Sequence, residues 1–278
     1  MTTIKHLLVN NLLTNSATPR LDVELLLAAA LAKPVSYLHT WPDEQVASNS
    51  LNKFNDYLQR RQLGEPIAYI LGRQGFWSLE LQVNEHTLIP RPDTETLVEV
   101  CLDHLAKDQQ LAILDLGTGT GAIALALAVE RPLAQLLGVD YITAAVQLAE
   151  QNRQRLSLTN VVFKQSNWFT ELGHQRFDLI VSNPPYIAAD DPHLNSGDVR
   201  FEPATALISG IAGLDDIKLI IQQAPDHLQT NGWLFLEHGY QQAPQVQHLL
   251  KIRGFKQIAT YHDLAGKERV TGGQWLCN

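Results

Sequence analysis

The sequence ILDLGTGTG at residues 113–121 decides the fold of this chain. Its first residues are mostly apolar, as in a buried strand, and its alternating glycines allow a tight turn in which the backbone comes close to a ligand. A helix that begins directly after such a turn directs its free amide groups into the space before the strand. The segment therefore predicts a strand, a ligand-binding loop and a helix, the first unit of a doubly wound α/β domain.

Strand-like apolar runs alternate with helical patterns through the rest of the chain, which is typical of a parallel sheet. We expect strands at 111–116, 134–139, 160–164, 177–182 and 232–237, and helices near 120–130, 142–156, 213–228 and 241–252. Two last strands, at 255–261 and 269–276, are separated only by a loop. A terminal hairpin added to a parallel sheet predicts a seven-stranded, Rossmann-like α/β fold.

The first part of the chain follows helical spacing instead. Its helical signals are Leu7, Leu8, Leu12 and Leu13, the segments 20–32 and 43–61, and a short segment from Pro66 to Gly72. Residues 75–89 then alternate as in a strand or hairpin, two prolines stiffen residues 90–92, and a helix follows at 94–105. We predict a small helical-bundle domain at 1–74, a β-hairpin and proline-rich linker at 75–92, and the α/β domain at 93–278.

The composition argues against several classes of function. A formal net charge of −8 speaks against a large basic face for nucleic acid. Cys101 and Cys277 lack metal-ligand spacing, so no metal site is expected. No segment approaches the ~20 apolar residues of a membrane span, and Asp22 and Glu24 spoil a signal-peptide interpretation of the segment that follows them. We expect a cytoplasmic protein that binds neither a membrane nor, stably, nucleic acid.

Three features could hold an adenosine-containing cofactor. The glycine loop consists of Gly117, Thr118, Gly119, Thr120 and Gly121, and its G-x-G-x-G spacing differs from that of nucleotide dehydrogenases. Asp140 ends the second strand, where a carboxylate can accept both ribose hydroxyls, although it could instead cap the next helix. Trp168 follows the third strand and could contact adenine or belong to the core.

The motif Asn183-Pro184-Pro185-Tyr186 follows the fourth strand and is suited to methylating a planar nitrogen. An amide nitrogen is a poor nucleophile, so it must be held in place with acceptors on its hydrogens. Asn183 offers its side-chain oxygen, Pro184 offers a preorganised carbonyl, and Tyr186 offers an aromatic wall. The alternative is a turn that merely ends a strand. The glycine loop on the same sheet favours catalysis through positioning, without a classical general base.

With these motifs, the chain resembles the bacterial release factor glutamine methyltransferases, the PrmC/HemK family, over essentially its whole length. Beside the glycine loop and the Asn-Pro-Pro-Tyr motif, the resemblance rests on Gly64-Glu65-Pro66-Ile67-Ala68-Tyr69, Phe76-Trp77, Leu88-Ile89-Pro90-Arg91-Pro92-Asp93-Thr94-Glu95, Phe201-Glu202-Pro203, Leu236-Glu237-His238-Gly239 and Glu268-Arg269. It implies a class I methyltransferase fold that uses S-adenosyl-L-methionine (SAM) and releases S-adenosyl-L-homocysteine. The implied substrate is the Gly-Gly-Gln glutamine of class I peptide chain release factors, methylated on N5.

The resemblance also implies roles for individual residues. The implied cofactor contacts are Gly117 to Gly121, Asp140, Trp168 and Asn183, and the glutamine is held by Asn183, Pro184, Pro185 and Tyr186. The helical domain is implied to grip the release factor. Asn167 departs from the Asp that related enzymes tend to carry, although its oxygen can still accept from adenine.

An alternative function is methylation of adenine N6 in nucleic acid, because DNA adenine methyltransferases share the asparagine-proline corner. Such an enzyme would usually need a basic surface and a base-flipping pocket. The tail adds a coincidence: Gly272-Gly273-Gln274 repeats the implied substrate motif within the predicted last strand. Strand pairing there is expected to hold that glutamine away from the site.

Overall fold

The computed structural model describes residues 2–10, 13 and 16–276, so Leu12 and Cys277 lie outside the described residues. The chain forms two compact units. The first comprises Met1–Arg73 with His193–Phe201, and the second comprises Gln74–Pro192 with Glu202–Asn278. Among the described residues, none of the helices is long and apolar enough to cross a membrane.

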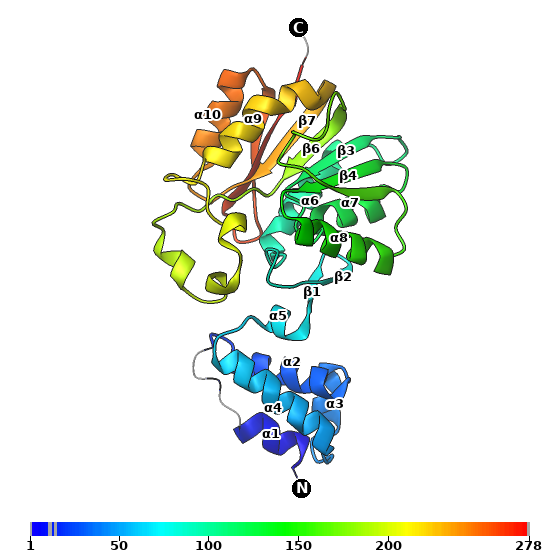
Figure 1. The fold of residues 1–278 in the computed structure, drawn as a ribbon, viewed down its shortest axis with the longest axis vertical. Coiled ribbons are helices and arrows are strands. Elements are labelled where there is room, and N and C mark those ends of the chain that lie inside the picture. The colour runs from blue at the N-terminus through cyan, green and yellow to red at the C-terminus, as the bar shows by residue number, and fades with distance from the viewer. Residues whose placement is uncertain (1, 11–12, 14–15, 277–278) are drawn as a thin grey trace. The chain divides into compact units, whose positions relative to one another are not determined.

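The second unit is built on a seven-stranded sheet of order β5-β4-β3-β6-β7-β9-β8, shown in Figure 1. The five strands from β5 to β7 are parallel, and β9 is antiparallel to both β7 and β8. The strands are β3 (Ala112–Leu116), β4 (Gln135–Asp140), β5 (Val161–Gln165), β6 (Phe177–Ser182), β7 (Leu228–Glu237), β8 (Lys256–His262) and β9 (Glu268–Trp275). The predicted seven-stranded sheet with a terminal hairpin is therefore confirmed.

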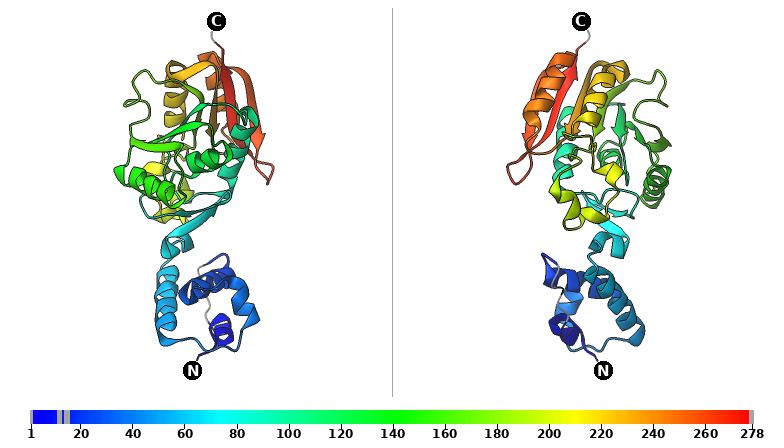
Figure 2. Two further views of the ribbon diagram at one scale, coloured as in Figure 1. Left: turned by 90° about the vertical axis from the view of Figure 1, so that its right-hand side faces the viewer. Right: turned by 60° about the vertical axis from the view of Figure 1, so that its left-hand side comes forward.

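Helices cover both faces of this sheet, as Figures 1 and 2 show. One layer contains α6 (Pro92–His104), α7 (Ala122–Glu130) and α8 (Thr143–Arg155), and the other contains α9 (Asp215–His227) and α10 (Ala243–Arg253). Successive residues of a strand enter opposite cores: Ile113 packs in the core that includes α6 and α7, and Leu114 packs in the core of α9 and α10. Because both faces are covered, the strands are continuously apolar rather than alternating.

A two-stranded hairpin precedes the sheet, in agreement with the alternating pattern in this region. It consists of β1 (Arg73–Phe76) and β2 (Leu79–Gln82). Its turn includes Trp77 at φ 56°, a conformation rarely adopted by a bulky residue. Asn152 fastens β2 to α8, since its amide donates to the Gln82 carbonyl at 3.0 Å and its oxygen accepts from the Gln82 N–H at 2.7 Å.

The first unit is a bundle of short helices around its own apolar core, which includes Leu26, Leu38 and Phe54. Its helices are α1 (Ile4–Asn10), α2 (Pro19–Leu31), α3 (Val35–Thr40), α4 (Ser48–Gln62) and α5 (Ile67–Leu71). The predicted start of a helix at residue 43 is wrong, because α4 begins at Ser48. Residues 43–47 instead pair with the start of the chain, where the Val46 N–H donates to the Thr2 carbonyl at 2.9 Å.

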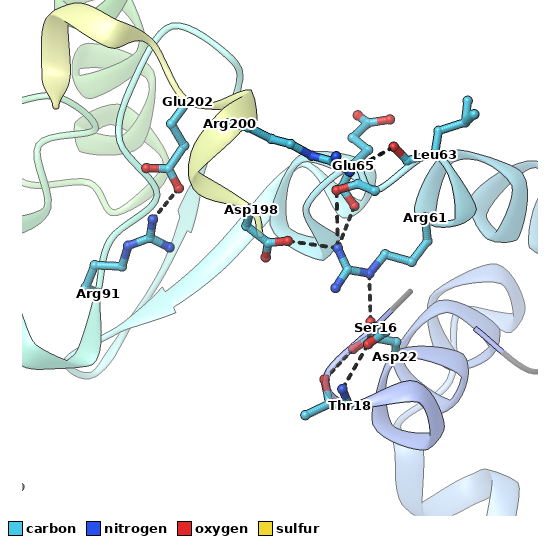
Figure 3. A network of polar contacts seen from close by, with 11 residues as sticks. Ser16, Thr18, Asp22, Arg61, Leu63, Glu65, Arg91, Asp198, Arg200 and Glu202 are labelled. Atoms are coloured by element: carbon cyan, nitrogen blue, oxygen red, sulfur yellow. Dashed lines mark hydrogen bonds and ion pairs between the residues drawn. The ribbon is translucent and has the colours of Figure 1, made fainter. Parts of the chain in front are cut away.

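Arg61 ties the segment His193–Phe201 to the helices of the first unit, as Figure 3 shows. Its guanidinium donates to Asp22 at 2.7 Å and to Asp198 at 2.9 Å. Asp22 is buried, and it also accepts from Ser16 at 2.7 Å and from Thr18 at 2.9 Å. A buried carboxylate needs such partners to offset its lost hydration, so Arg61 is the residue on which this part of the unit depends.

Candidate active site

A cavity of about 290 Å³ lies at the carboxyl ends of the parallel strands in the second unit. This edge is where open α/β sheets bind their ligands. The ends of the strands and the segments that follow them contribute to its wall: residues 117–120 after β3, 140–142 at the end of β4, 166–168 after β5, and Asn183 with Pro185 after β6. Among the described residues, no group of three or more His, Cys, Asp or Glu side chains could hold a metal ion.

The glycine loop turns at the end of β3 with three left-handed residues, Gly117 at φ 70°, Gly119 at 55° and Gly121 at 83°. Gly117 and Gly119 line the cavity. Gly121 has a different task, because a Cβ on it would lie 2.9 Å from Phe163 and 3.0 Å from Leu125. The glycines of the loop thus have two roles: Gly117 and Gly119 leave room for a ligand, and Gly121 allows helix–strand packing.

The side chain of Asp115 holds the glycine loop in place through hydrogen bonds. It is buried, and its Oδ2 accepts from the Thr118 hydroxyl at 2.6 Å and from the Ala124 N–H at 3.3 Å. Burial raises the pKa of Asp115 to about 7, against the effect of these two hydrogen bonds. Thr118 also donates its N–H to the Val139 carbonyl at 2.9 Å, so the loop is held to both β3 and β4.

Asp140 lies in the cavity wall at the end of β4. Its two oxygens accept from the N–H groups of Gly119 and Ile142, each at 2.9 Å. Burial raises its pKa, and the hydrogen bonds from Ile142 and Gly119 oppose the rise. Asp140 is not the N-cap of α8, since that position is Ile142. Each carboxylate oxygen has a second lone pair, so Asp140 can accept further hydroxyl donors.

Trp168 lies in the wall after β5 with φ at 50°. Ser166 stabilises this turn because its hydroxyl donates to the Trp168 carbonyl at 2.7 Å. A left-handed conformation costs a residue other than glycine about 1–2 kcal/mol, and such strain concentrates at functional sites. Trp168 belongs to the cavity wall and also packs against the core of α9 and α10. Asn167 lines the cavity beside it.

The Asn-Pro-Pro-Tyr motif meets the same cavity through Asn183 and Pro185. The Asn183 amide nitrogen donates to Thr94 Oγ1 of α6 at 3.1 Å. Of the predicted site residues, all of which the structure describes, Gly121, Pro184 and Tyr186 are not in the cavity lining. The Tyr186 hydroxyl instead donates to Glu237 Oε1 at 3.2 Å, and burial, followed by the Glu237 charge, raises the pKa of Tyr186.

Several wall residues were not assigned to the site from sequence. Thr94 lies on α6, and Arg91, which directly precedes that helix, donates to Glu202 Oε1 at 2.5 Å (Figure 3). The Glu202 carboxylate is buried, so this ion pair fixes one side of the cavity. The proline-flanked arginine and the Phe201-Glu202-Pro203 segment were visible as motifs. Their pairing across 111 residues of sequence was not.

The tail glutamine, Gln274, is held within the sheet. Residue 274 pairs with Trp233 on β7 and Lys256 on β8. Its side-chain nitrogen donates to the Asn231 carbonyl at 2.9 Å, and its oxygen accepts from Gln257 at 2.7 Å. Strand pairing therefore constrains the backbone of this Gly-Gly-Gln sequence, as expected.

Comparison with known proteins identifies the family. The family model described as a methyltransferase domain matches residues 107–268, and the PrmC N-terminal domain matches residues 9–72. A release factor glutamine methyltransferase of Pseudomonas aeruginosa is 58% identical over 277 residues, which cover 100% of both chains. The chain belongs to the release factor glutamine methyltransferases. The resemblance seen in the sequence is confirmed.

Other relatives agree with this membership. A release factor glutamine methyltransferase of Vibrio cholerae is 52% identical over 264 residues, or 94% of this chain and 92% of its own. The 16S rRNA N2 G1207 methyltransferase RsmC of T. thermophilus, solved in complex with AdoMet and guanosine, aligns with a TM-score of 0.53. It is 21% identical over 73% of this chain and 49% of its own, which shows a shared fold alone. The expected class I methyltransferase fold is confirmed.

Gly121→Ala tests the packing role of the third loop glycine in this methyltransferase. Gly266→Ala is its control, because Gly266 has a similar φ of 75° but nothing within 4 Å of an added Cβ. Both variants incur the cost of a left-handed alanine. We expect Gly121→Ala to lose about 1–3 kcal/mol more free energy of unfolding, because Phe163 and Leu125 must move. Urea denaturation measures both, and equal losses would refute the packing role.

Proposed function

We propose that this protein transfers a methyl group from SAM to the side-chain N5 of the glutamine in the Gly-Gly-Gln motif of class I release factors. The observation that carries the proposal is that Asn183 and Pro185 of the Asn-Pro-Pro-Tyr motif line the same cavity as the glycine loop. Membership of the release factor glutamine methyltransferases supports the choice of a glutamine amide over adenine as the acceptor. The net charge of −8 also favours a protein substrate over nucleic acid.

The residues around the cavity are suited to hold SAM. Gly117, Thr118, Gly119 and Thr120 provide a backbone cradle, and Asp140 provides acceptors for two ribose hydroxyls. Gly121 supports the cradle from outside the lining, because it allows the loop to pack on Phe163. Asn167 and Trp168 provide an amide and an aromatic face for adenine. When bound, SAM supplies an electrophilic methyl group.

The corner after β6 is proposed to hold the glutamine. Asn183 accepts one hydrogen of the substrate amide through Oδ1, and the Pro184 carbonyl accepts the second. Pro185 forms the adjoining part of the wall, and Tyr186, anchored on Glu237, keeps the corner in place. These acceptors orient the nitrogen and stabilise the positive charge that develops on it during transfer. After the methyl group has been transferred, the nitrogen releases its extra proton to solvent.

The helical unit, Met1–Arg73 with His193–Phe201, is proposed to recognise the body of the release factor. The match of residues 9–72 to the PrmC N-terminal domain supports this assignment. A substrate from translation termination would also place the enzyme in the cytoplasm. No stable complex with nucleic acid or a membrane is part of this function.

Methyl transfer to a release factor tests the function directly. After incubation of an unmodified bacterial release factor with SAM and the enzyme, peptide-mapped mass spectrometry should find one added methyl on the Gly-Gly-Gln glutamine. Asn183→Ala should lower this turnover about 100-fold or more while the circular dichroism spectrum is retained, since an acceptor at the reacting nitrogen is lost. A methyl group elsewhere on the factor, or full activity in Asn183→Ala, would contradict the proposal.

Asp140→Ala tests the cofactor side of the cavity. We expect SAM affinity, measured by isothermal titration calorimetry, to fall about 10-fold or more because two charge-assisted hydrogen bonds are lost. Asp178→Ala is the matched control: Asp178 also accepts a backbone N–H, from Ala112 at 2.8 Å, but is not in the cavity lining. An equal loss of affinity in both variants would assign Asp140 a purely structural role.

A further inference from the structure

A hydrogen-bonded network of buried side chains lies behind Asn183. Asn183 Nδ2 donates to Thr94 Oγ1 at 3.1 Å, and Tyr186 donates to Glu237 Oε1 at 3.2 Å. Thr94 also lies close enough to Glu237 to lower the pKa of its carboxyl as a hydrogen-bond donor. Thr94 is 4% exposed and Glu237 is 1% exposed. The network joins the first turn of α6, the end of β7 and the corner after β6, three elements that are distant in the sequence.

The chemistry of these groups determines which of them donate hydrogen bonds and which accept them. An ionised carboxylate can only accept, so the single hydroxyl hydrogen of Thr94 is donated to Glu237. Thr94 Oγ1 can then only accept from Asn183, which therefore presents its NH2 group to Thr94. The Asn183 carbonyl oxygen is left for the cavity that this residue lines.

We propose that Thr94 and Glu237 are positioning residues that fix the Asn183 amide with its oxygen toward the substrate, and so make the site select glutamine against glutamate. This inference rests on the proposed function. A glutamine amide brings N–H donors to Asn183 Oδ1, whereas a glutamate carboxylate brings only acceptors. A flipped Asn183 would reverse the preference, because its NH2 group would face the substrate. Selection against a mismatched group is strong when a buried polar atom would be left unpaired.

The state of Glu237 makes this selection depend on pH. Burial raises the pKa of Glu237 to about 7, against the Thr94 hydrogen bond, the Arg269 charge and the Tyr186 hydrogen bond, while Asp93 adds to the rise. Arg269 is itself paired with Asp93 at 2.9 Å and Asp263 at 3.3 Å. Above pH 7 the carboxylate accepts from Thr94. As pH falls through about 7, Glu237 gains a proton that it can donate to Thr94, whose hydrogen is then free to turn toward Asn183.

The test compares Thr94→Val, Thr94→Ser and Glu237→Gln with Thr96→Val, a control at a buried threonine on the same helix. The substrate is a full-length release factor, and the competitor is the same factor with glutamate in place of the motif glutamine. We expect Thr94→Val to lower kcat about 10- to 100-fold. In the same variant, the competitor's inhibition constant relative to KM should fall at least about 10-fold. Thr94→Ser and Thr96→Val should keep both values near wild type.

The pH profile provides a second readout. Wild-type kcat should decline as pH falls through about 7, and Glu237→Gln should be impaired without this decline, because glutamine does not titrate.

If Thr94→Val matches Thr96→Val in kcat and in competition by the glutamate form, the inference is overturned while the methyltransferase function stands. If Thr94→Val does not fold, Thr94→Ser with impaired selection would overturn it, and Glu237→Gln with lost selection would support it. A wild-type enzyme that does not methylate the factor overturns both the function and the inference.

Discussion

The register of β3 between its two neighbours is the constraint on which the site depends. Leu116, the last residue of β3, is paired with Val139 on β4 and with Ser182 on β6. The glycine loop, Asp140 and Asn183 therefore leave the sheet at one level, although they are far apart in the sequence. The Ser182 hydroxyl reinforces this register by donating to the Leu116 carbonyl at 2.7 Å. A slip of one residue would turn every strand side chain to the other face and separate the two halves of the site.

Two buried carboxylates, Asp115 and Glu237, lie behind the residues that line the cavity. Asp115 holds the glycine loop, and Glu237 holds Thr94 and Tyr186 behind the corner. Burial raises the pKa of each to about 7, so folding opposes their charged form. Each contributes stability that is fully present below its unfolded pKa and is lost as pH rises through about 7. The hydrogen bonds of both carboxylates therefore point to a role in positioning rather than in stability at neutral pH.

Much of the architecture could be predicted because the signals were local. The seven strands and the five helices α6 to α10 of the α/β domain follow from apolar runs, prolines and glycine turns. Other features depended on contacts that no local pattern reveals. Helix α3 (Val35–Thr40) was not predicted, because six residues are too few for a helical period to show. Strand β7 begins at Leu228, four residues before the predicted start, and its first part includes Asn231 at φ 66° and a register shift opposite β6.

The candidate site likewise contains some residues that the sequence predicted and others that it did not. The cavity lining includes Gly117, Gly119, Asp140, Trp168 and Asn183, which were all predicted from their positions after successive strands. Tyr186 was expected to form an aromatic wall of the site, but its hydroxyl donates a hydrogen bond to Glu237 Oε1. The partners Thr94 and Arg91 could not be assigned, because a buried hydrogen bond between distant segments leaves no periodic trace. The proposed catalytic and binding roles of the site residues remain predictions.

A crystal structure of the protein with S-adenosyl-L-homocysteine and a Gly-Gly-Gln peptide would show whether the corner after β6 holds the substrate nitrogen. We predict that the side-chain nitrogen of the peptide glutamine lies within hydrogen-bonding distance of Asn183 Oδ1 and the Pro184 carbonyl. We also predict that Asn183 Nδ2 remains hydrogen-bonded to Thr94 Oγ1 in this complex. A glutamine carbonyl oxygen facing Asn183, or a peptide bound away from the corner after β6, would contradict these predictions.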